Sequence, residues 1–263
     1  MSDLLRVDRD GALARVTLNR PEVRNAFNAE LIAALRQAFQ RLAVEPPASL
    51  RAVVLSGEGE SFCAGADIAW QRAAMSLSME ENEADAGKLQ EMLTEIDECP
   101  VPVIAAVHGL ALGGGMALCC VADVTIATAD TSFGFTEVKL GLIPAVISPF
   151  VLARLGEGPA RALFPSGERF GADRALRIGL ISELVEDRAA LAARVDQVVS
   201  EILSAGPEAA RSAKAVIREQ RGLARGDALA VTVRRAARQR VSEEGQEGLG
   251  AFLDKRPPAW RKG

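Results

Sequence analysis

The sequence has few of the residues from which metal sites are built. Its only histidine is His108, and its four cysteines, Cys63, Cys99, Cys119 and Cys120, show no CxxC spacing. Cys119 and Cys120 are adjacent in the chain and cannot readily form a disulfide with each other. We therefore expect no metal ion, and four buried, reduced thiols in a cytosolic protein.

Long apolar runs and an excess of positive charge are missing as well. No apolar stretch reaches the roughly 18 residues that a membrane-spanning helix needs. The opening MSDLLRVDRDGALARV has no basic segment followed by an apolar one, so we expect no signal peptide. The formal net charge is −4 and the isoelectric point is near 5.3, which is unfavourable for broad nucleic-acid binding. These features predict a cytoplasmic location, with no nucleic-acid and no membrane partner.

The chain does contain ample material for a folded core. Of its 263 residues, 49% are hydrophobic and 25% are charged, as is usual for soluble globular proteins. Hydrophobic periodicity predicts units of strand, strand and helix, with strands at 13–18, 52–55, 101–107 and 124–127 and a buried helix at 116–121. The fold class is therefore mixed α/β up to about residue 195, and helical after it.

Helix ends are also indicated by the sequence. Asn28 is expected to cap a helix that ends before Pro46. Ser148 is expected to cap a helix that begins at Pro149 and stops at Gly156. Residues 70–92 become increasingly acidic, which predicts a solvated, mobile flap rather than core.

The stretch GLALGGGMALCCVAD, residues 109–123, places three consecutive glycines before a predicted helix. A phosphate-binding loop needs Lys and then Ser or Thr after the glycines, and a dinucleotide site needs GxGxxG; neither pattern is present. Close packing of the helix against a strand and the approach of a ligand to bare backbone both remain open on this stretch alone.

Two more segments narrow this choice. SFCAGADI (61–68) and FGFTEVKLGLIPAVISPF (133–150), taken with the glycine stretch, closely resemble the crotonase, or enoyl-CoA hydratase/isomerase, superfamily. NRPEVRNAFN (19–28) and FLDKRPPAW (252–260) extend the resemblance over almost the whole chain. It implies a crotonase-like spiral of ββα units at 1–195 with the CoA and active sites. It also implies a helical trimerisation region at 196–263, and hence a homotrimer or homohexamer.

The resemblance also implies which groups do the chemistry. The backbone N–H groups of Ala66 and Gly114 would hold the oxygen of a thioester enolate, because a helix N-terminus offers unpaired N–H groups and a positive dipole end. Glu137 matches one of the two glutamates of the best-known hydratases, whereas Ala117 stands where the other would be. Apolar neighbours should raise the pKa of Glu137, which suits a group that takes and returns a proton.

Five further positions match residues that hold CoA in this family. Arg24 would meet the CoA phosphates, and Lys255 would reach a phosphate of CoA bound to a neighbouring subunit. Ala64, Asp67 and Ile68 would line the region of the adenine and pantetheine. Solvated surface charge is the alternative reading for the two cations. CoA enters as part of the substrate thioester, so no cofactor is expected.

Three reactions fit one glutamate. We favour hydration of a 2-enoyl-CoA to a 3-hydroxyacyl-CoA, since residues 137–161 are most similar to bacterial 3-methylglutaconyl-CoA hydratases of leucine catabolism. A Δ3,Δ2-enoyl-CoA isomerase and an acyl-CoA binder of low activity are the alternatives. A distal substrate carboxylate would need a cation, and Lys139 and Arg72 are within reach by position only.

Several other side chains have weaker claims to a role. No GxSxG motif ties His108 to a serine, so a structural hydrogen bond at a strand end is expected. Ser148 is a candidate for orienting a water molecule. Trp70 and Met75 are candidates for the lining of the acyl pocket.

Overall fold

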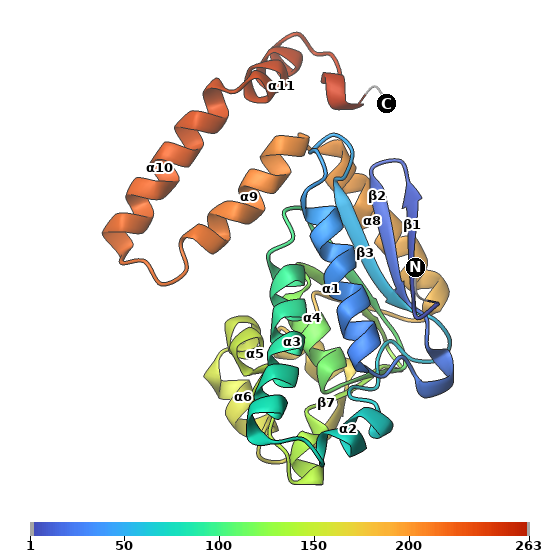
Figure 1. Ribbon diagram of the computed structural model, residues 1–263. Helices are drawn as coiled ribbons and strands as arrows, with labels where there is room; N and C mark the ends of the chain where they lie inside the picture. The colour runs from blue at the N-terminus through green and yellow to red at the C-terminus, as the bar shows by residue number, and fades with distance from the viewer. Residues whose placement is uncertain (1–2, 262–263) are drawn as a thin grey trace.

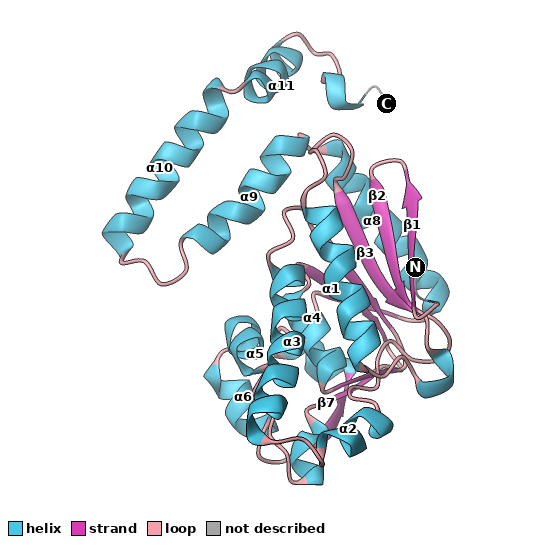
Figure 2. Cartoon of the chain, viewed as in Figure 1, coloured by secondary structure: helices cyan, strands magenta, loops and turns pink. Residues whose placement is uncertain are grey.

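Six strands form the main sheet, in the order β1-β2-β3-β4-β6-β9 (Figures 1 and 2). The computed structural model describes residues 3–261. The first two strands make an antiparallel hairpin, and every later pair is parallel. The strands are β1 Leu5–Asp10, β2 Leu13–Leu18, β3 Ala52–Gly57, β4 Val103–Val107, β6 Val124–Thr128 and β9 Glu183–Val185. The parallel pairing requires crossover connections, which the helices supply.

A second, smaller sheet lies next to the main one. It joins β5 Leu110–Leu112, β7 Ser132–Gly134 and β8 Arg169–Gly171. Because β5 follows β4 and β7 follows β6, successive strand pairs contribute one strand to each sheet before the chain enters a helix. The predicted α/β class and ββα order are confirmed.

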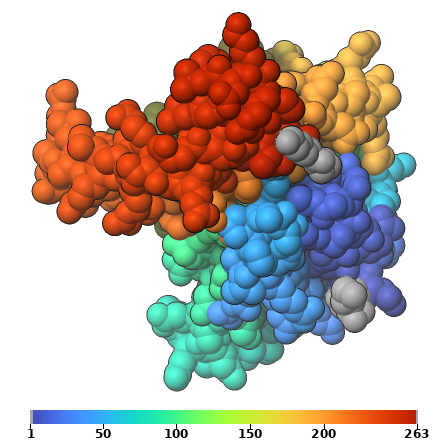
Figure 3. All heavy atoms as spheres, turned by 90° about the horizontal axis from the view of Figure 1, so that it is seen from above, coloured from blue at the N-terminus to red at the C-terminus, as the bar shows by residue number. Residues whose placement is uncertain are grey.

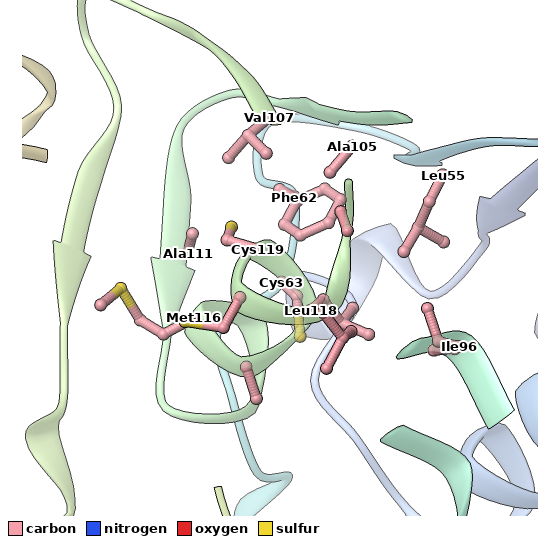
Figure 4. Packing of buried hydrophobic residues seen from close by; sticks show 14 of the residues in the cluster. Leu55, Phe62, Cys63, Ile96, Ala105, Val107, Ala111, Met116, Leu118 and Cys119 are labelled. Atoms are coloured by element: carbon pink, nitrogen blue, oxygen red, sulfur yellow. The ribbon is translucent and has the colours of Figure 1, made fainter. Parts of the chain in front are cut away.

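The two faces of the main sheet pack against different helices, since successive side chains of a strand point to opposite sides. On β2, Val16 and Leu18 join the large core under α1 Ala29–Ala43, α3 Met79–Asp97 and α4 Gly114–Val121. Leu13 faces the other way, toward Leu191 and Val195 of α8 Arg188–Ser204. Every residue of α4 from Gly115 to Val121 is buried, and Figure 4 shows its Met116 and Leu118 inside this core.

Most of the predicted helix ends are confirmed. The Asn28 side chain accepts a hydrogen bond from the Leu31 amide and caps α1, and Gly156 ends α5 Ser148–Leu155. The capping role of Ser148 is wrong: Ile147 is the cap residue, and the Ser148 hydroxyl donates to the carbonyl of Ala145. The chain already turns helically before Ser148, so that residue lies inside the first turn.

The acidic segment 70–92 does not form one uniform flap. It spans α2 Ile68–Ala74, a short connection, and most of α3. The first half of α3 is exposed and begins with a capping box in which Ser78 and Glu81 exchange hydrogen bonds. Met92 and Leu93, near its other end, are fully buried, so this part of the predicted flap belongs to the core.

The last three long helices form an arm that leaves the body (Figures 1 and 3). They are α9 Pro207–Glu219, α10 Arg225–Val241 and α11 Glu243–Leu253. Leu229, Val233 and Phe252 expose 58%, 68% and 82% of their surface on this arm. The boundary expected at residue 195 falls inside α8, and α8 packs against the sheet as far as Leu203.

The remaining helices are short, and they are α6 Glu157–Leu163, α7 Ala172–Arg177 and the 3₁₀ helices η1 Pro21–Val23, η2 Thr136–Leu140 and η3 Ala259–Arg261. Among residues 3–261, no helix combines the length and the apolar character needed to span a membrane.

Candidate active site

The three consecutive glycines each allow a different close approach at the start of α4. A Cβ on Gly113 would lie 3.2 Å from Oε1 of Glu137, and Gly113 has a φ of +47° that side chains rarely adopt. A Cβ on Gly114 would lie 2.6 Å from the ring of Phe27. A Cβ on Gly115 would lie 2.4 Å from the carbonyl oxygen of Cys63. The glycines therefore serve both purposes that the sequence left open. Gly114 and Gly115 allow close packing, and Gly113 leaves bare backbone beside Glu137.

The loop that contains GAD lies directly against the glycine loop. A Cβ on Gly65 would lie 3.0 Å from the Leu112 carbonyl oxygen and 3.8 Å from Cα of Gly113. Short bridges hold the two segments in register, with Cys63 paired to Ala111. The residues that follow each glycine, Ala66 and Gly114, are therefore brought close together.

The main-chain amides of Ala66 and Gly114 are left unused by the fold. In the bridge between Phe27 and Ala66, the Phe27 amide donates to the Gly65 carbonyl and the Asp67 amide donates to the Phe27 carbonyl. The Ala66 amide takes no part in this pairing. Gly114 is the first residue of α4, where amides have no intrahelical partner. Within residues 3–261, neither amide has an acceptor.

Glu137 is the second residue of η2, the helix that follows the buried Phe135. Its Oε1 lies over Gly113, and its Oε2 is buried without a hydrogen-bond partner in the described chain. Burial raises the pKa of this carboxyl, and a hydrogen bond from its own backbone only partly opposes that effect. A carboxyl in such surroundings accepts and releases a proton closer to neutral pH than an exposed glutamate does.

The carboxylate expected on α4 in the best-known hydratases is replaced by a buried methyl group. Ala117 lies one turn after Gly113, whose carbonyl accepts its amide, and it is completely buried. Neither acid at the start of α3 takes its place: Glu81 is bound in the capping box, and Glu80 is exposed. Glu137 is thus the acid that the structure brings to the glycine loop.

Four of the five residues predicted to hold CoA lie near this loop. Arg24 is exposed, and its carbonyl accepts the Ala64 amide at 2.9 Å. Ile68 exposes 82% of its surface. Asp67 uses both carboxylate oxygens within the protein, one on the Ala69 amide and the other on the Arg20 guanidinium, at 2.8 Å each. The main-chain amide and carbonyl of Asp67 are bonded as well, to the Phe27 carbonyl and the Gln71 amide, so Asp67 holds this loop in place.

Lys255 is not gathered with the other four. It follows α11 on the arm, is exposed, and has a positive φ of 54°. Figure 1 places α11 at the opposite end of the molecule from α2, where Ile68 lies. Within one chain Lys255 is remote from the glycine loop, which fits the expectation that it serves a neighbouring subunit.

Sequence reasoning missed the residues that hold the Arg24 loop in place. Asn25 is completely buried, although its φ of 55° lies in the left-handed region. Its side chain donates to the carbonyls of Glu58 and Ser61 and accepts from the Arg20 amide. The segment NRPEVRNAFN contains three asparagines, and asparagine side chains favour turns because they hydrogen-bond nearby backbone groups. This pattern could have predicted a turn held by Asn25.

The structure decides the role of His108, the only histidine. It is 4% exposed, and its Nε2 lies 3.1 Å from the Gly59 carbonyl oxygen. Burial lowers its pKa, so the ring is neutral at neutral pH. The predicted structural hydrogen bond at the end of a strand is confirmed. All four cysteines are buried free thiols.

Comparisons with known proteins agree with this geometry. The family model described as Enoyl-CoA hydratase/isomerase matches residues 8–263. A crotonyl-CoA hydratase of Syntrophomonas wolfei is 33% identical over 254 residues, which are 95% of this chain and 95% of that protein. The crystal structure of an enoyl-CoA hydratase from Shewanella pealeana is 36% identical, with a TM-score of 0.92 over 98% of this chain and 96% of that one.

A further solved structure, Pseudomonas aeruginosa AtuE, is 35% identical and has a TM-score of 0.94 over 98% of this chain and 100% of its own. With likeness in sequence and in fold over nearly the whole length, the chain belongs to the enoyl-CoA hydratase/isomerase family, which is the crotonase superfamily.

Proposed function

We propose that the protein reversibly hydrates a 2-enoyl-CoA to a 3-hydroxyacyl-CoA, with Glu137 as its single acid–base group. The observation that carries this proposal is the carboxyl of Glu137, whose Oε2 is buried with no partner in the described chain and whose Oε1 lies beside the bare backbone of Gly113. A group kept unpaired at a structural cost of about 1–3 kcal/mol is expected to have a functional reason.

The reaction follows from the three groups that meet here. Glu137 takes a proton from a water molecule, whose oxygen attacks C3 of the enoyl group. The electron pair of the double bond moves to the thioester oxygen, and the amides of Ala66 and Gly114 hydrogen-bond the resulting enolate. Glu137 then returns its proton to C2. One fixed amide donor of this kind typically contributes about 10²–10³ in rate.

The CoA part of the substrate would be held by Arg24, Ala64, Asp67 and Ile68, with Lys255 contributed by a neighbouring subunit. The exposed apolar residues of the arm, including Leu229, Val233 and Phe252, support its role in forming a trimer or a pair of trimers. The chemistry needs no metal, nucleotide or redox cofactor, and the enzyme would act in the cytoplasm.

The name of the Syntrophomonas relative favours a short acyl chain. An acidic acyl group such as 3-methylglutaconyl would require a cation near its distal carboxylate. Lys139 and Arg72 are both exposed, and neither has an ion-pair partner within residues 3–261. Trp70 is half-buried and Met75 is 86% exposed, so Trp70 is the better placed of the two to line an acyl pocket.

The buried Ala117 supports a second candidate, a Δ3,Δ2-enoyl-CoA isomerase. In that reaction one carboxylate removes a proton from C2 and returns it to C4, so a second glutamate is not needed. The oxyanion site and the CoA contacts would be the same.

One assay separates the candidates. The protein is incubated with crotonyl-CoA, 3-methylglutaconyl-CoA or a 3-enoyl-CoA, and the absorbance of the conjugated thioester is followed. Loss of absorbance with either of the first two means hydration, and a gain with the third means isomerisation. CoA-thioester binding without any change would indicate a binder of low activity.

Two variants locate the acid–base group in the same assay. Glu137→Gln should reduce turnover by about 10²–10⁴-fold, the usual contribution of general acid–base catalysis. Glu80→Gln removes an exposed acid of α3 and should leave turnover unchanged. Loss of activity in Glu80→Gln alone would refute the single-glutamate mechanism.

A further inference from the structure

A cleft of about 450 Å³ lies on the side of the main sheet that α8 covers. Its floor is made by β2, β3 and the end of β4, and its wall is the N-terminal half of α8. Glu137 and the glycine loop belong to the other side, with the core around α4. The cleft is therefore separate from the proposed active site.

The cleft exists because the side chains on this face of the sheet become small and polar toward the carboxyl ends of the strands. Nearer the amino ends, Leu13 and Ile104 fill the space under α8. Farther along, the positions on the same face are Thr17, Ser56 and Ala106, which leave the space open. The carboxyl edge of a parallel sheet is where ligands commonly bind in α/β proteins.

Polar groups without a full set of partners face this space. The hydroxyls of Thr17 and Ser56 lie 3.1 Å apart and bond to each other. His108 lines the cleft, and its Nε2 must donate to Gly59, because a carbonyl oxygen can only accept. The neutral ring then carries a lone pair on Nδ1, which has no partner within residues 3–261. His108, which is 4% exposed, thus offers one unused acceptor.

Of the charged side chains that line the cleft, Arg188 has no ion-pair partner in the described chain. Arg15 pairs with Asp196 at 2.9 Å, and Glu58 pairs with Arg6 outside the cleft. Arg188 donates to the Gly59 carbonyl at 2.7 Å and has no acidic partner in the described chain.

Two nearby acids form no ion pair with Arg188 in the described chain. Asp187 is used by the Ala190 amide as the cap of α8. Asp130, which acts electrostatically on His108, is held by the Thr128 hydroxyl. The guanidinium of Arg188 is therefore available for an anionic oxygen, and it is a side chain rather than the helix end that supplies the charge.

We propose that this cleft binds a small organic acid that also carries a hydroxyl group. The anionic oxygen would accept from Arg188, and the hydroxyl would donate to Nδ1 of His108 and bond to Ser56. A short carbon chain would lie against Val54 and Leu191, the apolar part of the lining. A hydroxycarboxylate and a polyol phosphate share this chemistry.

Titration calorimetry tests the proposal with four probes. 3-Hydroxybutyrate and glycerol 3-phosphate have both groups, whereas butyrate lacks the hydroxyl and glycerol lacks the charge. At least one of the first two should bind more tightly than its matched partner, by about 2–10-fold where the partner lacks the hydroxyl and by about tenfold or more where it lacks the charge. The tighter of the two identifies carboxylate or phosphate as the anion. Absence of binding by both at about 10 mM, an affinity too weak to be specific, would overturn the proposal.

Variants connect the binding to this cleft. Arg188→Gln should weaken binding about tenfold or more, and Ser56→Val should weaken it about 2–10-fold. Arg161→Gln, which removes an exposed arginine of α6, should not. Circular dichroism and the melting temperature report whether each variant is folded. Unchanged affinity in folded Arg188→Gln would place the ligand elsewhere and refute the assignment, and none of these readouts depends on enoyl-CoA turnover.

Discussion

Replacing Glu137 with glutamine should lower activity and, at neutral pH, raise stability. Burial raises the pKa of this carboxyl, so the folded protein carries its ionised form at a cost. Oε2 has no hydrogen-bond partner in the described chain that would offset that cost. Glutamine has nearly the same shape and no charge, so the variant removes the cost without opening a cavity.

The size of the gain follows from the surroundings of the carboxyl. The gain equals the cost of ionising the carboxyl in the folded protein, which is about 1.4 kcal/mol for each unit by which the folded pKa exceeds the unfolded one. A gain of about 1 kcal/mol corresponds to a melting temperature higher by about 2–4 °C for a chain of this size.

The gain should depend on pH in one direction. Because the folded pKa lies above the unfolded one, the native state binds more protons between the two values, and stability falls as pH rises through that window. The penalty is complete above the raised pKa and absent below the ordinary carboxyl value of about 4.3. Urea unfolding of wild type and variant should therefore differ at neutral pH and converge in acid.

The pH dependence of turnover should report the same raised pKa of Glu137. Hydration needs the ionised carboxylate, so the acid limb of the pH–rate profile should lie above the usual pKa of glutamate, and Glu137→Gln should abolish this limb with turnover. Glu201→Gln, which neutralises an exposed acid of α8, serves as the control. A Glu137→Gln variant that is less stable than wild type at neutral pH, or fully active, would refute the argument.

Four further variants test the oxyanion loop, the support of the Arg24 loop and the CoA contacts. Gly114→Ala brings a Cβ within 2.6 Å of the Phe27 ring, so the loop must shift, and crotonyl-CoA turnover should fall about 10²–10³-fold, as for the loss of one oxyanion donor. Asn25→Ala leaves two buried carbonyls and an amide unpaired and should lower the free energy of unfolding by about 1–3 kcal/mol in urea titrations. Arg24→Gln should raise KM for crotonyl-CoA severalfold with kcat unchanged. Lys255→Gln should have the same effect if chains associate, because its phosphate contact is to CoA on a neighbouring subunit. A change in kcat alone would contradict the phosphate contact.

Local patterns determined much of this protein. Alternation and helical spacing placed β2, β3, β4, β6 and α4, because each of these buries a regular face. Capping by Asn28 was readable for the same reason: a side-chain amide at a helix start satisfies amides two or three residues ahead. Ser148 was misread because Ser followed by Pro marks a helix start only to within a residue.

The tertiary structure alone decided how distant loops meet. That Gly113 faces Glu137, that Gly114 faces Phe27, and that the Ala66 amide is unpaired depend on contacts between segments more than 20 residues apart. The same holds for the cleft beside Arg188. It forms because small side chains of three neighbouring strands lie side by side under α8. Sequence patterns report what each residue prefers among its chain neighbours, whereas which backbone groups remain without a partner is settled only when all segments are packed.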